Sequence, residues 1–134
     1  MLLNKSIKKE TNMIGEISNT SDILDVRDII TRYETLESDD SRDDSDEMEF
    51  QTLSELLANL KGMGGDHQWK GDWYPVTLIH EDYFVEYTEE LCKDIGYISE
   101  DFPWWITIDW YDTAENIKQD YTEIDYEDQI YLTR

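Results

Sequence analysis

Apolar side chains recur at helical spacing in two stretches of the first half of the chain. Residues 21–37 predict one helix, with Ser21 or Asp22 as its N-cap. Its stripe consists of Ile23, Val26, Ile29, Ile30, Tyr33 and Leu36. Residues 50–63 predict another, ended by Gly62. The stripe of this helix consists of Leu53, Leu56, Leu57 and Leu60. A lone helix is marginal in water, so the 21–37 stripe must pack on the rest of the chain or on a second copy, as in a homodimer.

Residues 81–95 predict a helix with two contrasting faces, ended by Gly96. The apolar face holds Phe84, Tyr87, Leu91 and Ile95. The opposite face holds acids at steps of four residues, namely Asp82, Glu86, Glu90 and Asp94. Such steps place successive carboxylates about 6 Å apart along the helix axis, a spacing that approximates the phosphate row of one DNA strand. An ordinary solvated helix face is the other interpretation of this row.

The last third of the chain predicts a strand, a helix and a hairpin. Residues 102–108 are apolar and rich in β-forming side chains, which favours a buried strand. Asp109 then caps a helix over residues 110–121, with Asp112 at its third position. The apolar stripe of this helix is Trp110, Ala114, Ile117 and Tyr121. Residues 122–126 and 129–133 alternate around Glu127 and Asp128, which predicts a hairpin whose outward face holds Glu123 and Asp125.

These patterns together predict an α+β fold. Residues 50–134 form a small domain of helices and short strands that closes with the C-terminal β-hairpin. A helix over residues 21–37 and an acidic linker over residues 38–49 precede it, and residues 1–20 are expected to be a disordered leader. Charge without apolar periodicity favours a flexible or extended linker. Residues 66–74 are expected to be a loop.

The net charge is the most unusual property of the chain. The 134 residues carry 33 Asp and Glu against 11 Lys and Arg, a formal charge of -22. Residues 81–134 hold sixteen of the acids and three bases, together with twelve aromatic residues, so these acids belong to a folded surface. A basic protein is therefore the expected partner. Nucleic acid and membrane are not expected as direct partners, because binding either usually needs a basic face.

No residue pattern indicates catalysis, a metal site or a cofactor, so we expect a protein that is not an enzyme. His67 and His80 lack the spacing of a zinc site. A calcium loop that starts at Asp39 fails, because Asp44 stands where the motif needs glycine. Cys92 has acidic neighbours, which disfavour a reactive thiolate. A single cysteine forms no internal disulfide, which points to a reducing compartment, and we expect the cytoplasm of a host bacterial cell.

Three stretches of sequence, taken together, resemble a known group of proteins. They run from Asp25 to Ile30, from Thr77 to Tyr87 and from Ile108 to Thr122, and the chain closes with Gln129-Ile-Tyr-Leu-Thr-Arg134. They resemble small acidic proteins of phages and prophages, some of which are described as antirestriction proteins. The last stretch also resembles the ArdA type of antirestriction protein, a longer, multi-domain DNA mimic. This resemblance implies an origin in mobile DNA and a role against host defence.

The leading functional hypothesis is a DNA mimic. Its carboxylates would stand in for phosphates and block the nucleic-acid-binding groove of a host restriction enzyme or CRISPR effector. The residues expected to bind the partner are first Asp82, Glu86, Glu90 and Asp94, then Glu123 and Asp125, and finally the linker acids Asp39, Asp40, Asp43 and Asp44. The alternative is an adaptor that binds a host regulator through the 21–37 helix or through exposed aromatic side chains. A salt-adapted structural protein is disfavoured, because residues 51–80 are nearly balanced in charge.

Overall fold

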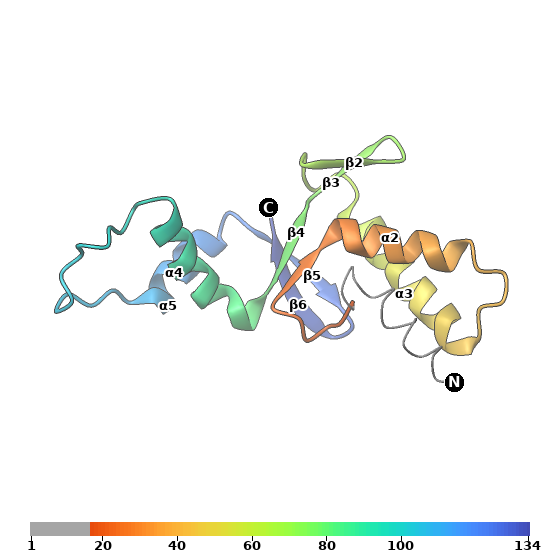
Figure 1. Ribbon diagram of the computed structural model, residues 1–134, viewed down its shortest axis with the longest axis horizontal. Helices are drawn as coiled ribbons and strands as arrows, with labels where there is room; N and C mark the ends of the chain where they lie inside the picture. Colours follow the sequence, from red (N-terminus) through yellow and green to blue (C-terminus); the bar gives the residue numbers. More distant parts are fainter. Residues whose placement is uncertain (1–16) are drawn as a thin grey trace, which may run out of the picture.

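The computed structural model describes residues 17–134 and has the expected α+β fold, arranged in three layers (Figure 1). The middle layer is a four-stranded antiparallel sheet in the order β1-β4-β6-β5. Its strands are β1 (Ile23–Asp25), β4 (Thr77–His80), β5 (Thr122–Tyr126) and β6 (Gln129–Thr133). One face of the sheet carries α2 (Val26–Glu37) and α3 (Asp44–Leu60), and the other carries α4 (Phe84–Asp94) and α5 (Trp110–Lys118).

The alternation of side chains along the strands gives the sheet two apolar faces. Leu78 on β4 points into the larger core, under α2 and α3, while its neighbour Ile79 points into the smaller core, under α4 and α5. On β6, Tyr131 and Leu132 divide in the same way. The sheet is therefore shared by two cores, and each pair of helices buries its own apolar face against it.

Four of the six residues of the predicted 21–37 stripe are buried within the chain, whereas Ile23 belongs to β1 and is 45% exposed, and Tyr33 is half-buried. Val26, Ile29, Ile30 and Leu36 are all at most 4% exposed and pack with the buried leucines of α3. The stripe thus needs no second copy to cover it. The helix begins later than predicted, because Ile23–Asp25 pair with β4 and Asp25, in place of Ser21 or Asp22, caps α2 by accepting a hydrogen bond from the Arg27 N–H.

The predicted linker over residues 38–49 is wrong in its second half. Residues 44–49 form the first turns of α3. Only residues 38–43 connect α2 to α3. Asp43 caps α3 by accepting a hydrogen bond from the Asp46 N–H at 2.8 Å. Asp44, Asp46 and Glu47 lie in the first turn, where the helix dipole favours negative charge. The acids that suggested an extended spacer therefore start a helix.

The predicted leader over residues 1–20 is also wrong at its end. Residues 1–16 lie outside the described part of the chain, but residues 17–20 pack on the fold. Ile17 contacts the larger core, and the side-chain amide of Asn19 donates a hydrogen bond to the Glu127 carbonyl at 2.9 Å.

In the C-terminal half, the predicted hairpin is present and the predicted strand over residues 102–108 is not. The hairpin of β5 and β6 is confirmed, with Glu127 and Asp128 at positive φ in its turn. The predicted buried strand over residues 102–108 is wrong, because this segment forms an irregular loop whose side chains are exposed or half-buried. An apolar run becomes a strand only where it pairs with another strand, and residues 102–108 pair with neither sheet of the described chain.

Two smaller features complete the fold. The expected loop over residues 66–74 contains a second, two-stranded sheet of β2 (His67–Trp69) and β3 (Asp72–Tyr74). Within residues 17–134, no helix combines the length and the apolar character that are needed to cross a membrane.

Candidate polyanionic surface

The inner face of α4 carries two buried side chains, of which Phe84 shares the smaller core with Ile79 and Leu132 of the sheet. Phe84 is 1% exposed and packs edge-on against the ring of Tyr121, with 5.0 Å between ring centroids. Thr88, one turn later, is fully buried, and its hydroxyl donates a hydrogen bond to the Phe84 carbonyl at 2.8 Å. Because the inner face is fixed, the outer face keeps a constant direction relative to the sheet.

A buried histidine sets the point at which this helical segment starts. A single 3₁₀ turn, η2 (Glu81–Tyr83), precedes α4, and His80 caps it by accepting a hydrogen bond from the Asp82 N–H at 3.0 Å. The other ring nitrogen of His80 lies 2.8 Å from the amide oxygen of Gln129 on β6. A histidine that accepts through Nδ1 must donate through Nε2 when neutral, so both contacts are satisfied by one tautomer. His80 is thus a capping residue, as its position before the helix suggests.

The four acids predicted on this helix are all exposed, and we call Asp82, Glu86, Glu90 and Asp94 the α4 ridge. Asp82 belongs to η2, and the other three belong to α4. Because steps of four residues advance the side-chain direction by about 40° on an α-helix, the ridge winds partly around the helix. Within residues 17–134, none of the four forms an ion pair with lysine or arginine.

One carboxylate of the ridge is positioned by a tyrosine. The Tyr83 hydroxyl donates a hydrogen bond to a Glu90 carboxylate oxygen at 2.9 Å, and this bond raises the pKa of Tyr83 above its ordinary value. The negative charges of Glu86 and Asp22 raise it further. The Tyr83 hydroxyl thus lies among acids from two parts of the chain.

Asp22 is an acid of this surface that sequence reasoning missed. It is exposed and directly precedes β1, and its carbonyl accepts a hydrogen bond from the His80 N–H at 2.8 Å. The pairing of β1 with β4 therefore brings residue 22 beside the start of the α4 segment. Helical periodicity carries no information about this contact between distant residues, and only the pairing of the strands reveals it.

The two lysines of this layer are each paired with an acid outside the ridge. Lys93 contacts Glu89 at 2.7 Å on α4, and Lys118 contacts Glu115 at 3.0 Å on α5. Both pairs are at the surface and are screened by solvent. They leave the ridge itself negative.

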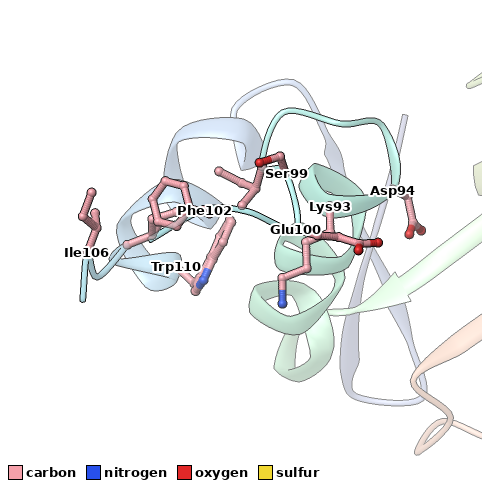
Figure 2. Close-up of a pocket in the computed structure, with 9 residues that line it drawn as sticks. Lys93, Asp94, Ser99, Glu100, Phe102, Ile106 and Trp110 are labelled. Carbon is pink, nitrogen blue, oxygen red and sulfur yellow. The ribbon is translucent and has the colours of Figure 1, made fainter. Parts of the chain in front are cut away.

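The end of the ridge borders an open hollow of about 620 Å³ between α4 and α5 (Figure 2). Asp94, Lys93 and Glu100 line it on the side of α4, and Phe102 and Trp110 line it on the side of α5. The hollow therefore combines an apolar wall with a charged rim.

Glu123 and Asp125 lie on the same face of the sheet as α4 and α5. Glu123 is opposite Leu132, a member of the smaller core, and Asp125 follows two residues later on the same side of β5. Both are exposed, as predicted. They occupy the edge strand, so they extend the acidic face beyond the helices.

The linker acids Asp39, Asp40, Asp43 and Asp44 lie on the opposite side of the sheet, at the turn between α2 and α3 (Figure 1). The structure thus does not bring them to the α4 ridge. Two of them have structural partners: Asp43 caps α3, and Asp39 accepts a hydrogen bond from the Ser41 N–H at 2.9 Å.

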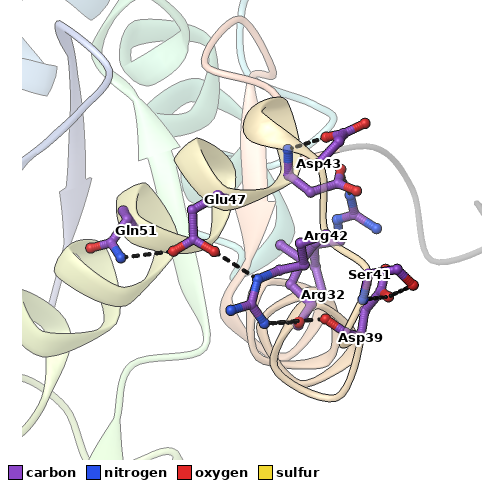
Figure 3. Close-up of polar contacts among 9 residues, drawn as sticks. Arg32, Asp39, Ser41, Arg42, Asp43, Glu47 and Gln51 are labelled. Carbon is purple, nitrogen blue, oxygen red and sulfur yellow. Dashed lines mark hydrogen bonds and ion pairs between the residues drawn. The ribbon is translucent and has the colours of Figure 1, made fainter.

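Arginines neutralise part of the charge in this second acidic region (Figure 3). Arg42 contacts Glu47 at 2.9 Å, donates to the Leu36 carbonyl at the end of α2 and lies over the ring of Phe50. Arg32 makes two hydrogen bonds to Glu49, at 2.7 and 2.9 Å. The acids near the turn therefore connect α2 to α3.

Other chemistry is sparse in the described part of the chain. Among residues 17–134, no group of three or more His, Cys, Asp and Glu side chains is placed to hold a metal ion. Cys92 is a half-buried free thiol on α4.

Comparison with known proteins adds no further constraint on the site: no protein-family model, curated protein or solved structure matches the chain.

Proposed function

We propose that this protein is an anti-defence inhibitor of mobile-element origin that acts as a DNA mimic. Its α4 ridge occupies the nucleic-acid-binding groove of a host restriction or CRISPR nuclease in the bacterial cytoplasm. The observation that carries the proposal is the ridge itself: four exposed carboxylates without lysine or arginine partners in residues 17–134, on a helix fixed by buried Phe84 and Thr88. Such a groove contacts nucleic acid largely through phosphates, so a fixed row of anions competes for the same cations.

Rigidity is the second support for this proposal. A flexible acidic tail must be ordered when it binds, which reduces its affinity, whereas a row of charges fixed on a folded scaffold avoids most of that cost. The Tyr83–Glu90 hydrogen bond and the His80 cap both order the ridge before a partner arrives. The resemblance of residues 108–122 to ArdA-type proteins is in agreement with this proposal and stays a prediction.

The adaptor alternative required either the 21–37 helix or exposed aromatic side chains as its contact surface. The stripe of α2 is buried in the larger core, so it is not available to a regulator. Exposed aromatic side chains are present, and most of them lie on residues 95–111.

Capture from a bacterial lysate with and without competing DNA tests the proposal. The immobilised full-length chain is expected to retain a nucleic-acid-binding protein, and excess duplex DNA is expected to release it. Binding should also weaken steeply as salt rises, because exposed charges are screened over about 10 Å at 0.1 M salt. A captured partner that is indifferent to both DNA and salt would contradict the proposal.

A further inference from the structure

The loop between α4 and α5, residues 95–109, exposes large apolar side chains beside the α4 ridge. Together with the first turn of α5, it contains six of the exposed large hydrophobic residues of the described chain. These are Ile95, Tyr97, Trp104, Trp105, Ile106 and Tyr111. Scattered apolar residues on a surface are ordinary, but a group of this size on one segment is typical of a binding site.

Two tryptophans stand at the tip of a β-turn in this loop. The Ile106 N–H donates a hydrogen bond to the Pro103 carbonyl at 3.1 Å, so Trp104 and Trp105 are the two central residues of the turn. Their side chains are 91% and 67% exposed. Turn tips usually hold glycine, proline, asparagine, aspartate or serine, for reasons of backbone conformation and solvation. Within residues 17–134, neither indole stacks on another aromatic ring.

The base of the loop is attached to α4. The N–H groups of Tyr97 and Ile98 both donate to the carbonyl of Cys92, at 2.9 and 3.2 Å. The hollow of Figure 2 lies beside this attachment, and its apolar wall consists of Ile98, Phe102, Ile106, Ile108 and Trp110. The loop thus offers both protruding rings and a recess that an apolar side chain of a partner can enter.

The charge around the loop defines the partner. Asp94 is the last acid of the α4 ridge and also lines the hollow, so the ridge and the apolar segment form one continuous surface. The loop itself adds the exposed acids Glu100, Asp101 and Asp109. A second copy of this chain would bring the same acids face to face, which disfavours self-association. A cationic surface has the complementary sign.

We infer that the α4–α5 loop is the apolar anchor of the same interface. Its partner is a protein whose basic groove adjoins an apolar pocket, and Trp104 and Trp105 fill that pocket while the α4 ridge binds the cations. This inference rests on the proposed function for the role of the ridge and adds the apolar half of the contact. Tryptophans are frequent among the few residues that dominate interface affinity, and charge around them directs the approach.

Binding of three synthetic peptides to the full-length chain tests the inference. The first carries lysines along one side and leucines along the other, the second replaces the leucines with serine, and the third replaces the lysines with serine. We expect the first to bind most tightly. We expect Trp104→Ser with Trp105→Ser to weaken it by at least about 10-fold, to near the affinity of the second peptide.

A matched control is available on another part of the surface. Trp73, on β3, is 48% exposed, so Trp73→Ser removes an exposed indole without touching the loop. We expect this variant to bind all three peptides as the wild type does. Thermal unfolding of each variant confirms that the fold is intact, since all three indoles project from the surface.

Several results would overturn the inference. Equal binding of the first and second peptides, or an unchanged affinity in the double tryptophan variant, would show that the loop is not an anchor. Sedimentation that detects a dimer of the wild type and a monomer of the double variant would assign the loop to a second copy instead. The two proposals fail separately: loss of DNA competition in the lysate experiment rejects mimicry alone, whereas loss of the leucine preference rejects the anchor alone.

Discussion

The turn between α2 and α3 and the segment from η2 to α5 are both strongly acidic, but their carboxylates have different surroundings. Near the turn, Arg32 and Arg42 pair with Glu49 and Glu47, and Asp43 caps a helix. On α4, the ridge acids face solvent, and lysine pairs with Glu89 beside them. Similar composition thus joins two helices in one region, whereas in the other it leaves four carboxylates without lysine or arginine partners among residues 17–134. Net charge alone does not distinguish these uses, whereas the partners of each carboxylate do.

The largest expected effect comes from a charge placed in the α2–α3 core. Ile29 is fully buried, so Ile29→Asp should lower the free energy of unfolding by at least about 3 kcal/mol, because the new carboxylate is buried without a partner. Both cores share the sheet, so the α4 side should unfold in the same transition. Urea unfolding followed by circular dichroism measures this effect.

Ala58→Asp is the control for this substitution, because Ala58 is an exposed residue of α3. It should cost no more than about 1 kcal/mol. If Ile29→Asp leaves the fold stable and only weakens partner binding, the α2 stripe is an interaction surface, as the adaptor alternative requires.

Arg42, near the α2–α3 turn, should contribute more to the free energy of unfolding than Lys93 on α4. Arg42→Ala removes a hydrogen bond to the Leu36 carbonyl and the contact with Phe50, and it should lower the free energy of unfolding by about 1–2 kcal/mol. Lys93→Ala removes an exposed pair and should change it by no more than about 0.5 kcal/mol. Equal losses in thermal or urea unfolding would remove the distinction between the two regions.

These residues also show what the sequence could predict. Local patterns located α2, α4, α5 and the hairpin, because a buried stripe or a cap is encoded within one element. The start of α3 was missed because its acids act through a cap and the helix dipole rather than through apolar spacing. The strand predicted over residues 102–108 failed because strand formation depends on a distant partner.

In the candidate site as well, local features could be predicted from the sequence, whereas features that depend on distant contacts could not. The spacing of the α4 ridge was visible in the sequence, and its acids are exposed as expected. The apolar face predicted opposite them is only partly confirmed, because Phe84 is buried, Tyr87 and Leu91 are half-buried, and Ile95 is 53% exposed. The contribution of Asp22 was not visible, because it depends on the pairing of β1 with β4. The separation of the linker acids from the ridge also depends on the layers of the fold.

A pH-dependent effect tests the contact between the N-terminal residues and the sheet. Burial raises the pKa of Tyr131 to about 12, from an ordinary value of 10.0, and its hydroxyl donates to the Ser21 carbonyl at 2.7 Å. Because the folded pKa is raised, this contribution to stability is complete below pH 10.0 and is lost as the pH rises through about 12. In alkaline unfolding, Tyr131→Phe should lose less stability over this range than the wild type.

This expectation has a control variant and one outcome that would contradict it. Tyr111→Phe changes an exposed ring of α5 and serves as the control. An alkaline unfolding curve that is identical in Tyr131→Phe and the wild type would contradict the role given to Tyr131.

The smallest effect is expected at the start of α2. Two hydrogen bonds from the Arg27 guanidinium lower the pKa of Asp25 below its ordinary value of 3.8. The ionised carboxylate therefore contributes stability above pH 3.8, and this is lost as the pH falls through the lower folded pKa. Asp25→Asn keeps a capping side chain but removes the charge, so its melting temperature should be slightly below that of the wild type at neutral pH. The difference should vanish in acid, and a difference that grows there would contradict the assignment.

The most direct test of the central claim compares two variants that each remove four negative charges. One replaces the α4 ridge (Asp82→Asn, Glu86→Gln, Glu90→Gln and Asp94→Asn), and the other replaces the linker acids (Asp39→Asn, Asp40→Asn, Asp43→Asn and Asp44→Asn). The measurement is the affinity of each full-length variant for the DNA-releasable protein captured from lysate. We expect the ridge variant to bind at least about 10-fold more weakly and the linker variant to bind nearly as the wild type does. Equal losses of affinity would show that only net charge matters. A loss confined to the linker variant would place the binding surface at the α2–α3 turn, on the side of the sheet opposite the ridge.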